Sequence, residues 1–293
     1  MFDLTQTVLI ASFALCLLSM VGAIPLAAYM RRQSQGIGWN YRGMVRTEPL
    51  NQLDLLGIAL LTGLYTLQCA FKLPQVIDFL VSTGLLSQTA TETPDQIQLT
   101  PAVLTAGMIS QAVPGMIVIV FLVFRQISVV EFFGLKWKHA PYLILLAPFA
   151  AVFVQMIFVG MEMAGYSTMI QEIFGKAEKQ EIVKIYQETN AVSIRVLLAI
   201  AAVVIAPLVE ETVFRGYIYP VCKRYTGRII ATFVTSLFFS AVHFNIPALL
   251  PLFILAILLT IAYELSGSLW VPISIHACFN GFTLLVQELQ PPS

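Results

Sequence analysis

Residues 203–215 read VVIAPLVEETVFR, an apolar run that contains two adjacent glutamates, Glu210 and Glu211, and ends at Arg215. One charged side chain near the centre of a membrane helix costs about 2.5 to 3.5 kcal/mol on insertion scales. Such residues are therefore rare, face the protein interior and mark functional sites. The pair predicts that this segment is a membrane helix that carries part of such a site.

The composition of the whole chain is typical of a polytopic membrane protein. Hydrophobic residues make up 58% of the sequence and charged residues 11%, and the mean hydropathy is +0.83, which is unusual for a soluble domain. The net charge is zero, so no basic surface indicates a nucleic-acid partner, and the expected surroundings are the lipid bilayer. The cysteines stand singly, without metal-binding spacing, and are interpreted as core residues: Cys16, Cys69, Cys222 and Cys278.

The distribution of apolar residues predicts an all-α fold, a transmembrane bundle of about eight helices. A spanning helix needs about 20 mostly apolar residues. The segments that meet this criterion are 6–30, 54–72, 101–124, 141–165, 195–222, 229–244, 247–264 and 269–287. Short turns join the last four, so we expect residues 191–293 to form a compact core that holds the polar site, preceded by an N-terminal part of residues 1–190.

The loops indicate an orientation and one interfacial element. Clusters of Lys and Arg follow the first, third and fifth segments, which places these loops in the cytoplasm, whereas the loop 82–100 contains neither residue. We therefore expect both chain ends on the opposite face. The polar stretch 166–190 has apolar residues at helical spacing, which favours an amphipathic helix packed on the bundle, with a lid over the site as the alternative.

Helical spacing separates the roles of the two glutamates. Residues four apart share a helix face, whereas adjacent residues point about 100 degrees apart. We therefore expect Arg215 to neutralise and orient Glu211, which leaves Glu210 free to act as a base. The alternative is a buried ion pair that only fixes helix packing.

Two histidines and an asparagine lie on the apolar segments that follow. His243 has Phe239 one turn before it, and His276 has Asn280 one turn after it. Burying so many polar groups in one short-looped bundle without a use is costly. At about 1.5 Å per residue, their depths can converge on one cavity near mid-membrane. Pro207 is the position where the fifth segment can break.

Two chemistries suit this set of side chains. In the first, Glu210, His243 and His276 hold a divalent metal such as zinc, with one position open for water. In the second, which needs no metal, Glu210 deprotonates a water held by the histidines, while His276 and Asn280 stabilise the oxyanion. Both lead to hydrolysis of an amide bond. The HExxH motif of soluble metalloproteases is not found, so both chemistries stay open.

These residues resemble a known family. Glu210-Glu211-x-x-x-Arg215, Phe239-x-x-x-His243 and His276-x-x-x-Asn280 follow in the order of three motifs of the CAAX protease and bacteriocin-processing family of intramembrane endopeptidases, which includes the type II CAAX prenyl endopeptidases. The resemblance covers roughly residues 195–287.

The resemblance implies a role for each matched residue. Glu210 would activate the water, and the polar residues of the second and third motifs would bind the water, the oxyanion or a metal. Glu211 and Arg215 would support them. The substrate would be a peptide or protein at the membrane, prenylated in some family members, and the location would be a prokaryotic plasma membrane.

Two other functions use the same polar cavity. A proton-coupled carrier also needs buried Glu and His, but it predicts paired repeats, which the sequence lacks. A membrane scaffold or immunity protein would keep the fold without catalysis. No sequence feature indicates an oligomeric state.

Overall fold

The computed structural model of the chain describes residues 43–70, 82, 100–136, 144–174, 189 and 191–289. Every regular element in these ranges is a helix and none is a strand, which confirms the predicted all-α class. The first expected segment, residues 6–30, lies outside the described residues, as does most of the loop 82–100.

Each of the other expected segments coincides with a helix. The N-terminal part contains α2 (Leu53–Ala70), α4 (Pro101–Phe124) and α7 (Ala147–Met163), together with two short helices outside the expected segments, α5 (Val129–Phe132) and α8 (Tyr166–Phe174). In the C-terminal half the helices are α10 (Val192–Ile200), α11 (Ala206–Val213), α12 (Tyr219–Thr226), α13 (Arg228–Val242), α14 (Ile246–Ser266) and α15 (Trp270–Leu289).

Four of the described helical stretches are long and apolar enough to cross a membrane, namely α2, α4, α14 and the continuous run Val192–Thr226. The pair α7 and α8, bent by 58°, adds a fifth if it counts as one span. α13 has only 15 residues, because Phe244 takes a positive φ of 53° and Asn245 caps the next helix by accepting from Ala248 N. The chain is an integral membrane bundle, and the number of about eight spans stays a prediction.

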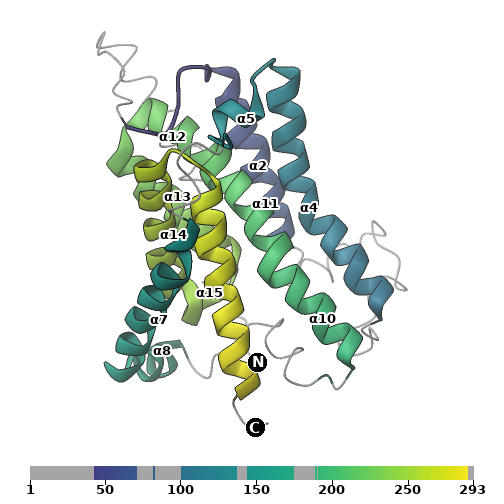
Figure 1. Cartoon of the computed structure of the whole chain (residues 1–293), viewed down its shortest axis with the longest axis vertical. Helices are drawn as coiled ribbons and strands as arrows, with labels where there is room; N and C mark the ends of the chain where they lie inside the picture. Colours follow the sequence, from purple (N-terminus) through teal and green to yellow (C-terminus); the bar gives the residue numbers. More distant parts are fainter. Residues whose placement is uncertain are drawn as a thin grey trace.

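The long run Val192–Thr226 contains two π-helical turns, Ala201–Ile205 and Phe214–Ile218. A proline follows each turn, Pro207 after the first and Pro220 after the second. A proline ring inside an α-helix clashes with the carbonyl four residues earlier, and a local π turn relieves that clash. The helix therefore changes its hydrogen-bonding pattern before Pro207 and continues without a break. It crosses the bundle diagonally in Figure 1.

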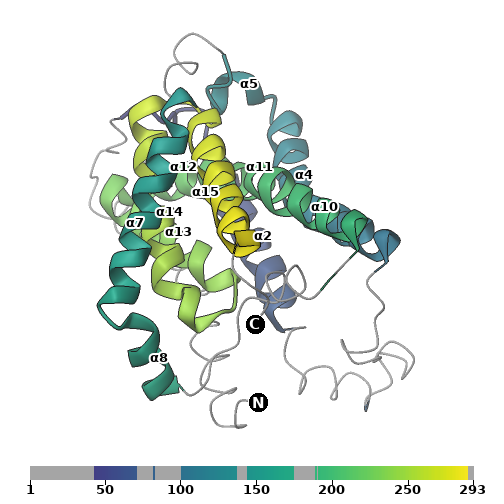
Figure 2. The ribbon, with the colours of Figure 1, turned by 60° about the horizontal axis from the view of Figure 1, so that its bottom comes forward.

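The C-terminal helices enclose the centre of the bundle together with helices from the N-terminal part. α13 packs along α14, α15 packs along α7, and α4 lies against α11, as Figures 1 and 2 show from two directions. One apolar cluster includes the rings of Phe214, Phe238 and Phe239 together with residues of α2 and α4. A second cluster joins α7, α14 and α15.

Polar contacts also tie the N-terminal part to the C-terminal half. Arg125 at the end of α4 donates to the fully buried Asp54 of α2 at 2.7 Å, and the Tyr217 hydroxyl donates to the same carboxylate at 3.3 Å. Lys223 and Arg224 donate to backbone carbonyls of the segment before α2. The two parts thus pack on each other directly, and the division between residues 190 and 191 stays a prediction.

The amphipathic stretch is described only as far as α8. Ile170 is buried, Ile173 on the same helix is exposed, and the Tyr166 hydroxyl donates to the Pro247 carbonyl at the start of α14 at 3.0 Å. This part is a helix packed on the bundle, and its position at the membrane interface stays a prediction. Residues 175–188 and 190 lie outside the described ranges.

Arg125→Gln removes one partner of a buried ion pair, because the Asp54 carboxylate is fully buried and only 2.7 Å from Arg125. Such a loss costs about 3 to 5 kcal/mol, so we expect a clearly lower unfolding temperature in detergent. Lys136→Gln is the matched control, because its pair with Glu131 is exposed and contributes little. An equal shift in both variants would show that the buried pair does not stabilise the bundle.

Candidate active site

Three of the predicted side chains converge from three different helices. Glu210 lies on α11, His243 directly after α13 and His276 on α15. The Glu210 Oε2 atom is 3.8 Å from His243 Nε2 and 3.9 Å from His276 Nε2. His276 is almost fully buried, and the other two side chains are about one fifth exposed, at 18% for Glu210 and 24% for His243. The site is thus enclosed but reachable.

Glu211 holds the opposite edge of the His276 ring. Its Oε1 accepts from Arg215 Nη1 at 2.9 Å, the pair that the spacing predicts, and also from His276 Nδ1 at 2.8 Å. Arg215 additionally donates to the Ala256 carbonyl of α14 at 3.1 Å. All of these groups are buried. Glu211 therefore orients both a cation and an imidazole, and it links α11 to α15.

Phe239 lies between these polar groups. Its ring centroid is 4.4 Å from the Arg215 guanidinium, 4.8 Å from the His243 ring and 5.9 Å from the His276 ring. A buried guanidinium over an aromatic face gains a cation–π attraction. The Phe239 carbonyl also accepts from His243 Nδ1 at 2.7 Å. This residue of the second motif thus positions Arg215 and both histidines.

The hydrogen bonds at Nδ1 decide what each Nε2 can do. A backbone carbonyl or a carboxylate can only accept, so both histidines donate from Nδ1. In a neutral imidazole the Nε2 atom is then an acceptor. Both Nε2 atoms face Glu210 Oε2, which is buried and has no hydrogen-bond partner within the described residues. A buried oxygen without a partner indicates that a water or a substrate group belongs there.

The same three side chains are the predicted zinc ligands. Two ligands at about 2.05 Å in tetrahedral geometry stand about 3.3 Å apart, which is closer than the 3.8 and 3.9 Å found for Glu210 and the histidines. Among the described residues no group of three His, Cys, Asp or Glu side chains is arranged to hold a metal ion. As they stand, the three side chains are therefore set wider apart than zinc ligands.

Asn280 has a structural partner that the sequence did not indicate. Its amide nitrogen donates to the Ala202 carbonyl at 2.7 Å. In the first π turn the Ala206 N–H bonds to the Ala201 carbonyl, so the next carbonyl, that of Ala202, would pair with residue 207. Residue 207 is a proline and has no N–H. One N–H of Asn280 replaces the missing donor and fixes α15 to the turn that precedes Glu210.

Tyr65 of α2 is a neighbour of the site that lies outside the three motifs. Its ring packs against Phe214 and Phe238 with centroid separations of 5.5 and 5.8 Å, and its phenol lies within electrostatic range of Glu210. One turn later, Cys69 donates to the Val242 carbonyl, next to His243, at 3.7 Å. The N-terminal part therefore forms one wall of the site.

Comparison with known proteins supports the resemblance over the segment that carries all three motifs. Residues 192–282 match the family model described as type II CAAX prenyl endopeptidase Rce1-like. The resemblance predicted from the motifs is thus confirmed for this part of the chain.

Two curated relatives each match about a third of the chain. The membrane-embedded CAAX protease MroQ of Staphylococcus aureus (strain USA300) is 37% identical over 94 residues, which are 30% of this chain and 38% of that protein. The putative membrane peptidase YdiL of Bacillus subtilis (strain 168) is 28% identical over 95 residues, 32% of this chain and 38% of that protein. The chain thus spans well under half the length of either relative. No solved structure matches it significantly.

Asn280→Ala leaves the Ala202 carbonyl without its donor, which we expect to lower the free energy of unfolding by about 1 to 3 kcal/mol. In a Pro207→Ala background residue 207 regains an N–H, so the same substitution should cost less, with a coupling of about 1 kcal/mol. Unfolding of the four proteins in mixed micelles measures this cycle. Equal costs in both backgrounds would mean that Pro207 does not create the need for Asn280.

Proposed function

We propose that this protein is an intramembrane endopeptidase that hydrolyses peptide bonds of membrane-associated peptides or proteins. The observation that carries the proposal is the buried Glu210 Oε2, which has no hydrogen-bond partner among the described residues and faces two imidazole Nε2 atoms at 3.8 and 3.9 Å. The match of residues 192–282 to an endopeptidase family, and the two relatives named as membrane peptidases, support it. The bacterial origin of both relatives supports a prokaryotic plasma membrane as the location.

Glu210 acts as the general base in this mechanism. A water that lies between Glu210 Oε2 and the two Nε2 atoms is within hydrogen-bond reach of all three, because separations near 3.9 Å allow contacts of about 2.8 Å to a shared oxygen. The Glu210 carboxylate takes one proton from this water, and the oxygen adds to the carbonyl carbon of the scissile peptide bond. Glu210 then returns the proton to the amine as the C–N bond breaks.

The second requirement is a donor for the oxyanion. The His276 ring, whose Nδ1 donates to Glu211, can stabilise the oxyanion through Nε2 when that atom carries a proton. The second N–H of the Asn280 amide supplies a further donor, since the first is held by Ala202.

A membrane-associated substrate follows from the depth of the site. Glu210 lies near the middle of a 35-residue apolar helix, and the surfaces of α4 and α7 that surround the bundle are rich in exposed apolar side chains. A peptide bond reaches such a site at least cost when the substrate itself partitions into the bilayer. Among the family's substrates, these properties fit peptides with an apolar or lipid-modified segment.

Glu210→Gln keeps the size of the side chain but removes the base, so we expect the cleavage rate to fall by at least about 100-fold. The assay uses the purified full chain in proteoliposomes with a library of apolar peptides, and mass spectrometry of the products. Glu162→Gln is the control, because it makes the same substitution at an exposed glutamate near the end of α7. Full cleavage by the Glu210 variant would rule out the mechanism.

We expect the same cleavage to persist in the presence of a chelator, because the proposed steps use only protein side chains and water. Elemental analysis of the purified protein is the matching measurement, with less than one metal ion per chain expected. Loss of activity with chelator and its recovery with zinc would instead assign Glu210, His243 and His276 to the metal chemistry.

A further inference from the structure

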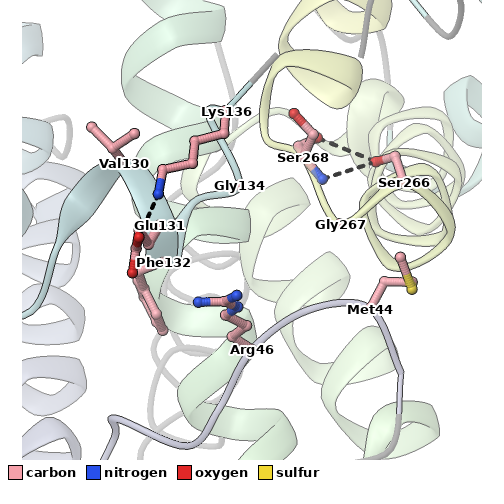
Figure 3. Close-up of a pocket in the computed structure, with 10 residues that line it drawn as sticks. All are labelled: Met44, Arg46, Val130, Glu131, Phe132, Gly134, Lys136, Ser266, Gly267 and Ser268. Carbon is pink, nitrogen blue, oxygen red and sulfur yellow. Dashed lines mark hydrogen bonds and ion pairs between the residues drawn. The ribbon is translucent and has the colours of Figure 1, made fainter. Parts of the chain in front are cut away.

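A second polar pocket lies at the end of the bundle where α5 and the start of α15 meet. It has a volume of about 280 Å³ and is formed by three separate stretches of the chain. The lining residues come from the segment before α2, from α5 with the loop after it, and from the turn between α14 and α15 (Figure 3). None of the residues of the proposed endopeptidase site lines it.

The charged side chains of this pocket leave one positive charge in excess. Lys136 forms an ion pair with Glu131, and Figure 3 shows their side chains directed toward each other. The Lys136 ammonium, and with a smaller effect Arg46, lowers the pKa of the Glu131 carboxyl. Glu131 therefore stays negatively charged, and its charge is balanced by Lys136. The Arg46 side chain lines the same pocket and is exposed. It is therefore available to an anion.

Ser268 supplies an independent indication of a ligand. This residue is only 6% exposed and lines the pocket, and its hydroxyl oxygen is buried without a hydrogen-bond partner in the described part of the chain. Buried hydroxyls are almost always paired with protein or with a bound molecule. Ser268 also precedes α15, a helix of 20 residues whose N-terminus carries partial positive charge and favours anions.

The walls of the pocket are held by backbone contacts. The Leu269 N–H donates to the Phe133 carbonyl at 2.9 Å, which joins the loop after α5 to the turn before α15. Gly134 and Gly267 both have positive φ, and a Cβ at Gly134 would stand only 1.8 Å from the Gly267 carbonyl oxygen. Only glycine permits this approach. The backbone of the fold thus holds the walls of the pocket in place.

We propose that this pocket binds the phosphate group of an anionic phospholipid. Arg46 would pair with the phosphate, the Ser268 hydroxyl would donate to it, and the N-terminus of α15 would add its partial charge. The location agrees with this ligand, because those described basic residues that predict the cytoplasmic face, among them Arg125, Lys136 and Arg224, lie at this end, and anionic headgroups are enriched at that face. A free phosphate ion has the same chemistry, and the test separates the two sources.

The test uses the full chain in nanodiscs of phosphatidylcholine that contain a minor fraction of phosphatidylglycerol, and native mass spectrometry counts the retained lipids. Phosphatidylcholine retained in the same sample is the internal reference. We expect Arg46→Gln to weaken phosphatidylglycerol retention about tenfold and Ser268→Ala about fivefold. Arg228→Gln is the control, because Arg228 is an exposed arginine at the same end of the bundle that does not line the pocket.

Inorganic phosphate added as a competitor separates the sources. Retention that persists supports a lipid site to which the acyl chains contribute, whereas displacement by phosphate supports a site for the phosphate group alone. Unchanged retention in both pocket variants would overturn the proposal, and so would an equal loss in Arg228→Gln, which indicates non-specific charge. Peptide cleavage is not a readout here, so this test stands apart from that of the proposed endopeptidase.

Discussion

The contact on which the site depends is the one between Glu211 Oε1 and its two donors, Arg215 Nη1 and His276 Nδ1. Charged groups at bilayer depth persist only when they are paired and hydrogen-bonded. Here one carboxylate oxygen satisfies a guanidinium on its own helix and an imidazole on another, and the guanidinium reaches the Ala256 carbonyl on a third. The same bonds that reduce the cost of burial also set the direction of His276 Nε2. Stability and geometry of the site therefore rest on the same atoms.

The long helix shows how an irregularity can serve such a site. Pro207 would break an α-helix, yet the chain passes it through a π turn and leaves one carbonyl, that of Ala202, without a backbone donor. Asn280 supplies this donor from α15. Glu210 follows Pro207 by three residues, so its position depends on the turn and on the helix that stabilises it. The hydrogen bond from Asn280 thus replaces the backbone hydrogen bond that Pro207 removes.

Much of this arrangement can be predicted from the sequence because it depends on local spacing. The i, i+4 relation predicts the pair of Glu211 with Arg215, and apolar run lengths predict the helices. The bond from His276 to Glu211 joins residues 65 positions apart, and no pattern in one sequence encodes it. The Ala202 carbonyl has no side-chain signature, and Tyr65 is one of 10 tyrosines. The end of α13 at Val242 lies within two residues of the expected end, but the positive φ of Phe244 could not be predicted, because a bulky residue rarely adopts it.

The order of the helices along the chain has a consequence for biosynthesis. Glu210, Glu211 and Arg215 are made before α15, which brings His276 and Asn280. A nascent chain that has been translated as far as the turn after α14 thus has its carboxylates but not the imidazole that completes the Glu211 contact. The protein acquires a complete set of polar partners only after the last described helix has entered the membrane. Any activity that needs His276 is therefore absent until α15 has been translated.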